Sequence, residues 1–87
     1  MLERGDAVRS ASGRDKGLLL CVVGAGDGFV YVCNGKARPL DNPKRKNPKH
    51  LAAVNARLSE AEMASDRALR KALAILKEQT EIQTGGN

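Results

Sequence analysis

Positive charge is concentrated in one short segment of this chain of 87 residues. Residues 36–50 carry six lysine or arginine side chains and one aspartate, whereas residues 1–35 and 51–87 each carry equal numbers of basic and acidic side chains. The segment therefore holds the whole formal net charge of +5. Lysine and arginine bind phosphates, and arginine can bind two oxygens at once. A local basic patch on a neutral body indicates a polyanion partner such as nucleic acid, and a solvated loop that only aids solubility is the alternative.

Two Asn-Pro pairs lie inside this basic segment. Pro43 and Pro48 fix their own φ near −65°, and Asn42 and Asn47, which precede them, are biased toward extended conformations. The lysines between them would then be displayed on a stiffened segment that loses less entropy on binding than a glycine-rich arm would. The alternative is that the prolines only end strands and route the chain.

Side chains that catalyse reactions or bind metals are few. The chain has one histidine, His50, and two cysteines, Cys21 and Cys33. No serine–histidine–aspartate or cysteine–histidine arrangement is visible, and these three side chains fall short of the four ligands of a structural zinc site. The glycines of "GAGDG" precede the extended run "FVYV", so they predict a hairpin turn and not a phosphate-binding loop. We expect a non-catalytic protein with no cofactor, no metal and no small-molecule substrate.

The cellular compartment can be inferred from the apolar pattern. No apolar run approaches the roughly 20 residues of a membrane helix, and the start "MLERGDAVRS" lacks the apolar centre of a signal peptide. We therefore expect a cytoplasmic protein with no membrane contact. Cys21 and Cys33 should then be reduced and buried. They lie at equal distances from Asp27, so a hairpin there would place them on facing positions, and a cross-strand disulfide is the alternative.

Short extended runs separated by turn residues fill the first half of the chain. Asn34 and Gly35 predict a two-residue hairpin, because both positions of that turn need positive φ. Pro39 lacks an amide hydrogen and is expected at an edge or a strand end. Five short strands at close spacing predict a mainly β fold, a small and strongly bent five-stranded β-barrel. The predicted strands cover residues 6–11, 18–23, 29–33, 36–40 and 50–54.

One amphipathic helix is predicted over residues 59–80. Ser59 and Glu62 have the spacing of a capping box, and Leu58 and Met63 that of a hydrophobic staple. Covering an open side of the barrel is the plainest use of its apolar face, although a partner or dimer surface would have the same periodicity. The apolar face follows the i, i+3, i+4, i+7 rule through Leu69, Ala72, Leu73 and Leu76.

The predicted organisation has three parts. A barrel domain covers residues 1–57 and includes the basic loop 41–50. The C-terminal amphipathic helix covers residues 58–80, and a flexible tail covers residues 81–87. On the exposed side of the helix, Asp66 and Arg70 are expected to form a favourable i, i+4 pair.

Three motifs together resemble a known family. The stretch "GDAVRSASGRDKGLLLCVV" resembles the KOW motif, and "VYVCNGKARPL" followed by "NPKRKNPKHL" is similar to the small bacterial KOW-domain RNA-binding proteins. These in turn resemble the KOW ribosomal proteins of the archaeal and eukaryotic large subunit. The resemblance covers about residues 4–54 and implies an SH3-like β-barrel that binds RNA, commonly ribosomal RNA, without catalysis.

The resemblance and the charge pattern together give a set of expected contacts. Gly13 and Gly17 bracket a turn that the family implies to face RNA. Two positions depart from the family pattern: Asn34 stands where an aspartate is expected, and Pro39 where a polar or basic residue is expected. The expected RNA-binding side chains are Arg14, Lys16, Lys36, Arg38, Lys44, Arg45, Lys46, Lys49 and His50.

The aromatic side chains bear on the mode of recognition. Phe29 and Tyr31 are the only two, and their spacing places them on one face of a strand. We expect them to serve the core, with exposure of the Tyr31 ring or hydroxyl at the surface as the alternative. Phosphate and shape recognition of folded RNA is therefore favoured over reading of unpaired bases. The alternative functions are a protein-interaction adaptor that docks on ribosomal, transcription or translation proteins, and a general nucleic-acid binder that accepts DNA equally.

Overall fold

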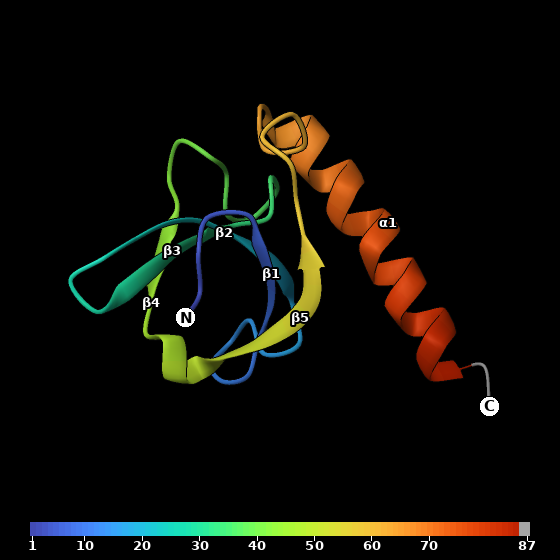
Figure 1. Ribbon diagram of the computed structural model, residues 1–87, viewed down its shortest axis with the longest axis horizontal. Helices are drawn as coiled ribbons and strands as arrows, with labels where there is room; N and C mark the ends of the chain where they lie inside the picture. Colours follow the sequence, from blue (N-terminus) through green and yellow to red (C-terminus); the bar gives the residue numbers. More distant parts are fainter. Residues whose placement is uncertain (86–87) are drawn as a thin grey trace.

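The computed structural model describes the backbone of residues 1–85 and the side chains of residues 1–80. It is mainly β: five antiparallel strands form one curved sheet, and a helix follows them (Figure 1). The order across the sheet is β4-β3-β2-β1-β5, so the first four strands are successive neighbours and the fifth returns beside the first. The elements are β1 (Asp6–Ser10), β2 (Leu19–Gly26), β3 (Phe29–Cys33), β4 (Lys44–Lys46), the 3₁₀ helix η1 (Pro48–His50), β5 (Leu51–Arg57) and α1 (Asp66–Gly85).

The hairpin between β2 and β3 forms where the sequence predicts a turn. Asp27 and Gly28 both have positive φ, 54° and 80°, as a tight two-residue turn requires. The resulting register places Cys21 opposite Cys33. The predicted facing positions of the two cysteines are therefore confirmed, and both are buried free thiols.

The predicted strand over residues 36–40 is wrong. The chain makes a loop from residue 34 to residue 43, and the fourth strand lies inside the basic segment instead. The side-chain oxygen of Asn34 accepts hydrogen bonds from the amides of Lys36 and Arg38, at 3.0 and 2.9 Å, which folds the chain back locally. Only Gly35 of the Asn-Gly pair has positive φ, 76°, so the predicted two-residue hairpin is also wrong.

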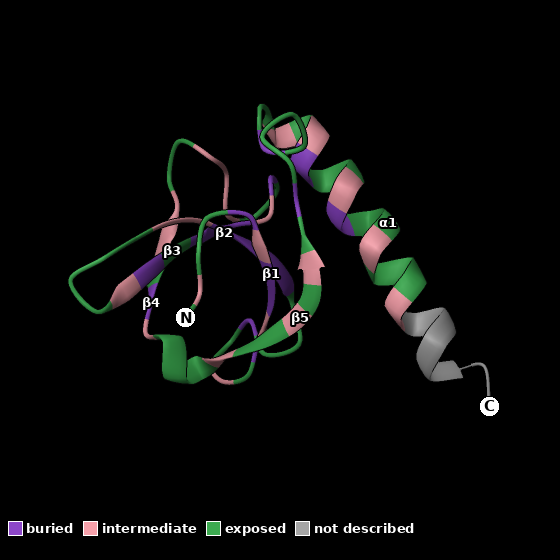
Figure 2. Ribbon diagram, in the orientation of Figure 1, coloured by how far each residue is buried: buried purple, intermediate pink, exposed green. Residues whose placement is uncertain are grey.

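Both faces of the sheet bury apolar side chains, because successive side chains along each strand point to opposite faces. One face buries a cluster of five aliphatic side chains: Val8, Leu20, Val22, Val30 and Val32. The opposite face buries Ala7, Leu19, Cys21 and Cys33 against the segment that follows β5 and against α1. Figure 2 shows that the buried residues concentrate on β1, β2 and β3 and along the side of α1 that faces the sheet.

The helix begins later than predicted. The capping box forms, since Ser59 and Glu62 exchange backbone-to-side-chain hydrogen bonds of 2.8 and 3.2 Å, but it closes a separate turn. The hydroxyl of Ser65 then accepts from the amide of Ala68 at 3.1 Å and caps the first turn of α1. The break between the two caps has a packing reason, because it allows Leu58 and Met63 to be buried against the sheet before the helix starts.

The first half of α1 covers the sheet. Leu69 and Leu73 are buried there, whereas Ile75 is 48% exposed where the helix leaves the sheet. Asp66 and Arg70 bond to the loop at residues 34–43 instead of forming the predicted pair: Leu40 donates its amide to Asp66 Oδ1, and Arg70 donates to the carbonyl of Gly35, both at 2.8 Å. The helix continues to Gly85, into the predicted tail, and residues 86–87 lie outside the described residues.

The buried thiols should resist alkylation in the folded protein. Burial raises the pKa of Cys21 to about 12, with a further contribution from Cys33, and burial raises the pKa of Cys33 to about 11. Because the thiolate is the reactive form, we expect iodoacetamide at pH 8 to modify neither cysteine until urea unfolds the chain. Mass spectrometry before and after unfolding measures this. Rapid labelling of the native protein would show that the face under α1 is open to solvent.

Candidate nucleic-acid interface

The short strand β4 divides the basic segment between two faces of the sheet. Lys44 and Lys46 stand opposite Val32 and Val30, whose side chains belong to the cluster of five aliphatic side chains. We call the face of the sheet with this cluster the inner face and the opposite face the outer face. Arg45, between them, stands opposite Tyr31 and is exposed on the outer face. The period of two along a strand therefore sends neighbouring basic side chains in opposite directions.

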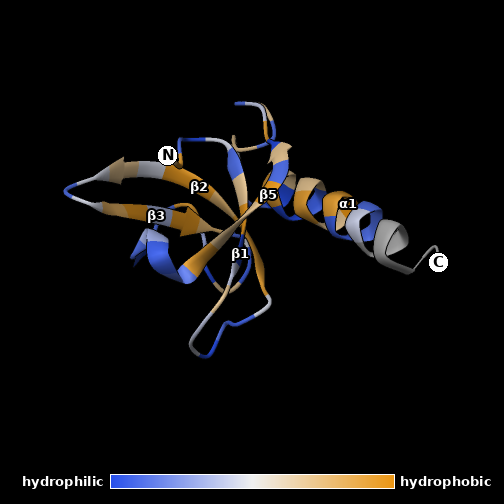
Figure 3. Cartoon of the chain, turned by 60° about the horizontal axis from the view of Figure 1, so that its bottom comes forward, coloured by the Kyte–Doolittle hydropathy of each residue, from blue (hydrophilic) through white to orange (hydrophobic). Residues whose placement is uncertain are grey.

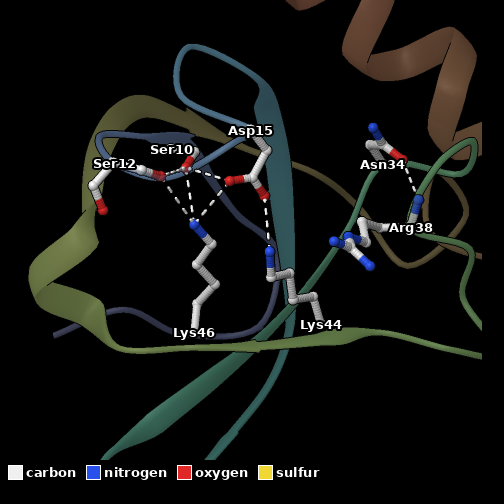
Figure 4. A network of polar contacts seen from close by, with 7 residues as sticks. All are labelled: Ser10, Ser12, Asp15, Asn34, Arg38, Lys44 and Lys46. Carbon is white, nitrogen blue, oxygen red and sulfur yellow. Dashed lines mark hydrogen bonds and ion pairs between the residues drawn. The ribbon is translucent and has the colours of Figure 1, made fainter.

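Lys46 is buried and paired. Its ammonium group lies 3.0 Å from Asp15 Oδ1 and 2.9 Å from the hydroxyl of Ser10, and the side chain is 8% exposed. The ammonium of Lys44, which is one-third exposed, lies 3.6 Å from the other oxygen of Asp15 (Figure 4). Lys46 therefore has little access to a ligand, because its charge is already compensated inside the protein, and its contact with RNA stays a prediction. Lys44 keeps partial access to solvent.

Asp15 is ionised in this arrangement despite its burial. Burial by itself acts to raise the pKa of Asp15. Hydrogen bonds from Lys46 and Ser10, and the positive charges of Lys46 and Lys44, outweigh that effect and hold the pKa below its ordinary value. Oδ2 of Asp15 accepts no hydrogen bond within residues 1–80, so the ammonium of Lys44 is its compensating charge.

This buried group connects segments that are far apart in the sequence. Asp15 lies in the turn between β1 and β2, while Lys46 lies in β4 at the edge of the sheet. A second connection joins the same parts of the chain, since the amide of Ala11 donates to the carbonyl of His50 at 2.8 Å. The turn at residues 12–17 is thereby held beside β4 and η1.

Four of the expected contact residues are exposed at this junction. None of their side chains makes a hydrogen bond or ion pair with another described residue, so the charges of Arg14, Lys16 and Lys49 are available to a ligand. We call this surface the basic end, and it consists of Arg14, Lys16, Lys49 and His50.

The two segments that meet here hold the charge imbalance of the chain. Residues 12–17 and 44–50 together carry six basic side chains and one acidic one, and that difference equals the net charge of +5. The remaining residues are balanced. Lys36 and Arg38 belong to the basic segment of the sequence but lie outside these two segments. The turn beside residues 44–50 contributes Arg14 and Lys16 instead.

Lys36 and Arg38 lie in the loop that packs against α1. Lys36 is exposed and lines a surface pocket of about 330 Å³ together with Gly17 and Arg70. It therefore lies near the end of the turn that carries Lys16. Arg38 is half-buried, and its amide and carbonyl bond to residues 34 and 35. Of the two, Lys36 is the more accessible to a ligand.

Sequence reasoning missed two features of this surface. Asp15 was not recognised as the partner of the lysines, although it is the only acidic residue in the "GRDKG" turn. Phe29 and Tyr31 are not buried in the core: Tyr31 is 37% exposed, which is the alternative considered for it, and Phe29 is half-buried on the outer face. The guanidinium of Arg45 lies 4.6 Å from the centre of the Phe29 ring.

Comparisons with known proteins leave the identity of the chain open. No model of a protein family matches it, and no curated protein matches it.

Among the residues that the structure describes, no helix has the length and apolar character needed to cross a membrane. Within the same residues, no group of three or more histidine, cysteine, aspartate or glutamate side chains could hold a metal ion.

Proposed function

We propose that this protein is a non-catalytic, cytoplasmic RNA-binding protein whose basic end binds the phosphates of structured RNA, with ribosomal RNA as the partner. The observation that carries the proposal is the buried pairing of Asp15 with Lys46 and Lys44, which holds two basic segments side by side. It leaves a group of unpaired positive charges on a body that is otherwise neutral. Clustered positive charge of this kind is the electrostatic footprint of nucleic-acid binding.

The proposed fold is the SH3-like barrel of the KOW family. Support comes from the return of β5 beside β1 after a four-stranded meander. The bond from Lys46 in the edge strand to Ser10 in β1 also indicates strong curvature, because these strands are separated by two others in the sheet. In the proposed family the turn after the first strand faces RNA, and here that turn carries Arg14 and Lys16.

Folded RNA is the proposed ligand of the basic end because its charges project from a turn and a 3₁₀ helix. Such side chains can follow phosphates along a helical groove, where recognition depends on shape and backbone more than on bases. The proline at the start of η1 and the hydrogen bond from the amide of Lys49 to the side chain of Asn47, at 3.0 Å, restrain this part of the chain before binding. A restrained surface loses less entropy on association.

The test uses two matched double variants and a ribosomal RNA stem-loop. If three to five phosphates are neutralised, log K should fall against log salt with a slope of about −2 to −4. Replacing Arg14 and Lys49 with alanine should make the slope shallower by about 1.4 to 1.8 and weaken binding about 10- to 100-fold at low salt. Fluorescence anisotropy of labelled RNA measures both quantities.

The control removes the same two residue types elsewhere. Arg67 and Lys71 are exposed on α1, so their replacement with alanine changes net charge equally without altering the basic end. We expect this control to bind almost as the wild type does. Equal losses in the two variants would contradict a localised site, and unaltered binding by the Arg14 and Lys49 variant would refute the proposed one. Competition with duplex DNA at the same salt concentration decides whether RNA is preferred.

A protein-interaction adaptor is the second candidate, and one observation favours it. Past Leu73 the apolar side of α1 is only partly covered: Leu76 packs against the cluster under the helix but Ile75 is exposed, and both line a surface hollow with Ala56 and Leu58. Such a surface fits an apolar partner segment of the transcription or translation machinery. Affinity capture with and without ribonuclease separates the two candidates, because an adaptor keeps its protein partners after RNA is digested.

A further inference from the structure

The outer face of the β2–β3 hairpin displays the two aromatic rings beside residues without side chains. Tyr31 stands opposite Gly24, and Phe29 stands opposite Gly26. A methyl group added at Gly24 would touch the ring of Tyr31 at 3.9 Å, and one at Gly26 would meet nothing within 4 Å. The rings are therefore flanked by bare backbone on the β2 side, so a flat ligand can approach them.

A bulge in β2 produces this arrangement. Val22 stands opposite Val32, but the next pair is Gly24 with Tyr31, so the register shifts by one residue between them. Without the shift Val23 would stand opposite Tyr31 and cover part of its ring. Bulges redirect side chains in this way, and they are frequent next to functional sites. Here Val23 packs instead with the cluster beneath α1.

Arg45 completes the surface from the other side of β3. It stands opposite Tyr31 in the register, and its guanidinium lies over the ring of Phe29 at 4.6 Å from the centroid. No carboxylate pairs with Arg45 within residues 1–80, so it keeps its charge and its donors for a ligand. Aromatic rings next to an arginine plane are the side chains on which unpaired bases stack.

The rings lie close to the basic end along the chain. Arg45 lies between Lys44 and Lys46, and Lys49 follows it by four positions, at most about 14 Å of extended chain. The hairpin projects from the body of the sheet, with a hydrophilic tip at Asp27 and Gly28 (Figure 3). A strand of RNA that contacts both surfaces must therefore cross the edge strand β4, because Arg45 faces away from Lys44 and Lys46.

We propose that Phe29, Tyr31 and Arg45 form a stacking platform for an unpaired nucleobase of single-stranded RNA. The inference rests on the proposed function, since it identifies a second part of the same RNA ligand. It replaces the expectation that recognition depends on phosphates and shape alone. A phosphate-only surface has no use for two rings held open by a bulge and two glycines, whereas a base needs a flat apolar face next to a positive charge.

The chain contains a built-in probe for this contact. Tyr31 is its only tyrosine and it has no tryptophan, so tyrosine emission reports this residue alone. We expect a single-stranded oligouridylate or oligoadenylate to quench that emission at low salt. The quenching should saturate with the same dissociation constant as the anisotropy of the labelled RNA. A blunt, fully paired RNA duplex should bind without quenching. N-acetyltyrosinamide titrated with the same RNA corrects for light absorbed by the bases.

Variants test the platform by affinity rather than by emission. Replacing Tyr31 with leucine should weaken single-strand binding about 5- to 150-fold, which corresponds to one stacked base, and should leave duplex binding unchanged. Replacing it with phenylalanine keeps the ring and should keep most of the affinity. Ile75, which is 48% exposed on α1, serves as the control, and its replacement with alanine should change neither affinity.

Each contrary outcome has a distinct meaning. Suppose that the duplex and the single strand both bind, that RNA does not quench the emission, and that the leucine variant binds as tightly as the wild type. The platform is then refuted and the proposed function stands. If no RNA binds, both fail. If emission depends on protein concentration without RNA, a second copy of the chain covers the rings, which also refutes the platform.

Discussion

Replacing Asp15 with asparagine should lower the free energy of unfolding by about 3–5 kcal/mol, because the change leaves the buried ammonium of Lys46 without a counter-charge. The two side chains are 9% and 8% exposed, so water cannot compensate the lost ion pair. Lys44 is one-third exposed and can turn toward solvent. Urea unfolding followed by circular dichroism measures the effect. A loss below about 1 kcal/mol would show that Lys46 reaches solvent when its partner is removed.

The pH dependence of the same variant provides a second measurement. Because the pKa of Asp15 is held below its ordinary value, its contribution to stability is complete above about pH 4, the pKa of an unfolded aspartate. The contribution is lost as the pH falls through the lower pKa of the folded state. The difference in stability between the wild type and the asparagine variant should therefore be largest near neutral pH and should shrink on acidification.

A double variant separates the charge from the packing. Replacing Asp15 with leucine and Lys46 with methionine removes both buried charges together, and such replacements are often neutral or stabilising. We expect the double variant to be more stable than the single asparagine variant. It should also test the proposed interface, because Arg14 and Lys49 are retained. If its RNA affinity matches that of the wild type, the paired charges act only by holding the surface together.

Replacing Gly35 with alanine should lower the free energy of unfolding by about 2–5 kcal/mol, from backbone strain and lost hydrogen bonds. Gly35 has a φ of 76°, and an added Cβ would overlap the carbonyl oxygen of Asp66 in the first turn of α1. The helix must then move away, and the bond from Arg70 to the carbonyl of Gly35 would be lost. Faster alkylation of Cys33, which lies under α1, should accompany the change.

Gly17 is a suitable control for Gly35. It also has positive φ, 91°, but an added Cβ there would meet nothing within 4 Å. Replacing Gly17 with alanine should therefore cost only the strain of the backbone, about 1–3 kcal/mol, and should leave the alkylation of Cys33 unchanged. Equal effects of the two replacements on alkylation would indicate that the contact with α1 does not hold the helix in place.

Features that depend on neighbouring residues were predicted well. The turn at Asp27 and Gly28, the strands on both sides of it and the facing positions of Cys21 and Cys33 follow from local backbone preferences and from a period of two. The capping box at Ser59 also formed as predicted. In each case the deciding interactions lie within a few residues of one another, so the amino-acid pattern is sufficient.

Features that depend on distant contacts were not predicted. The same "SxxE" pattern that caps a helix closes a separate turn here, because burying Leu58 and Met63 against the sheet requires a break before α1. The Asn-Gly pair does not make a hairpin, since Gly35 is needed for the close approach of the helix. In the first case packing of segments far apart in the chain outweighed the local preference, and in the second it acts together with the local hydrogen bonds from Lys36 and Arg38 to Asn34.

The candidate interface shows the same division. The amino-acid pattern alone located the excess of positive charge in a proline-containing segment and placed Arg14 and Lys16 in a turn. Which charges are free was settled by folding, because the partner of Lys46 lies 31 residues away and is reached only when the sheet curves. Burial is a property of the packed chain. Lys46, which neutralises Asp15, and Arg45, which faces solvent, therefore cannot be told apart until the register of their strand, β4, is known.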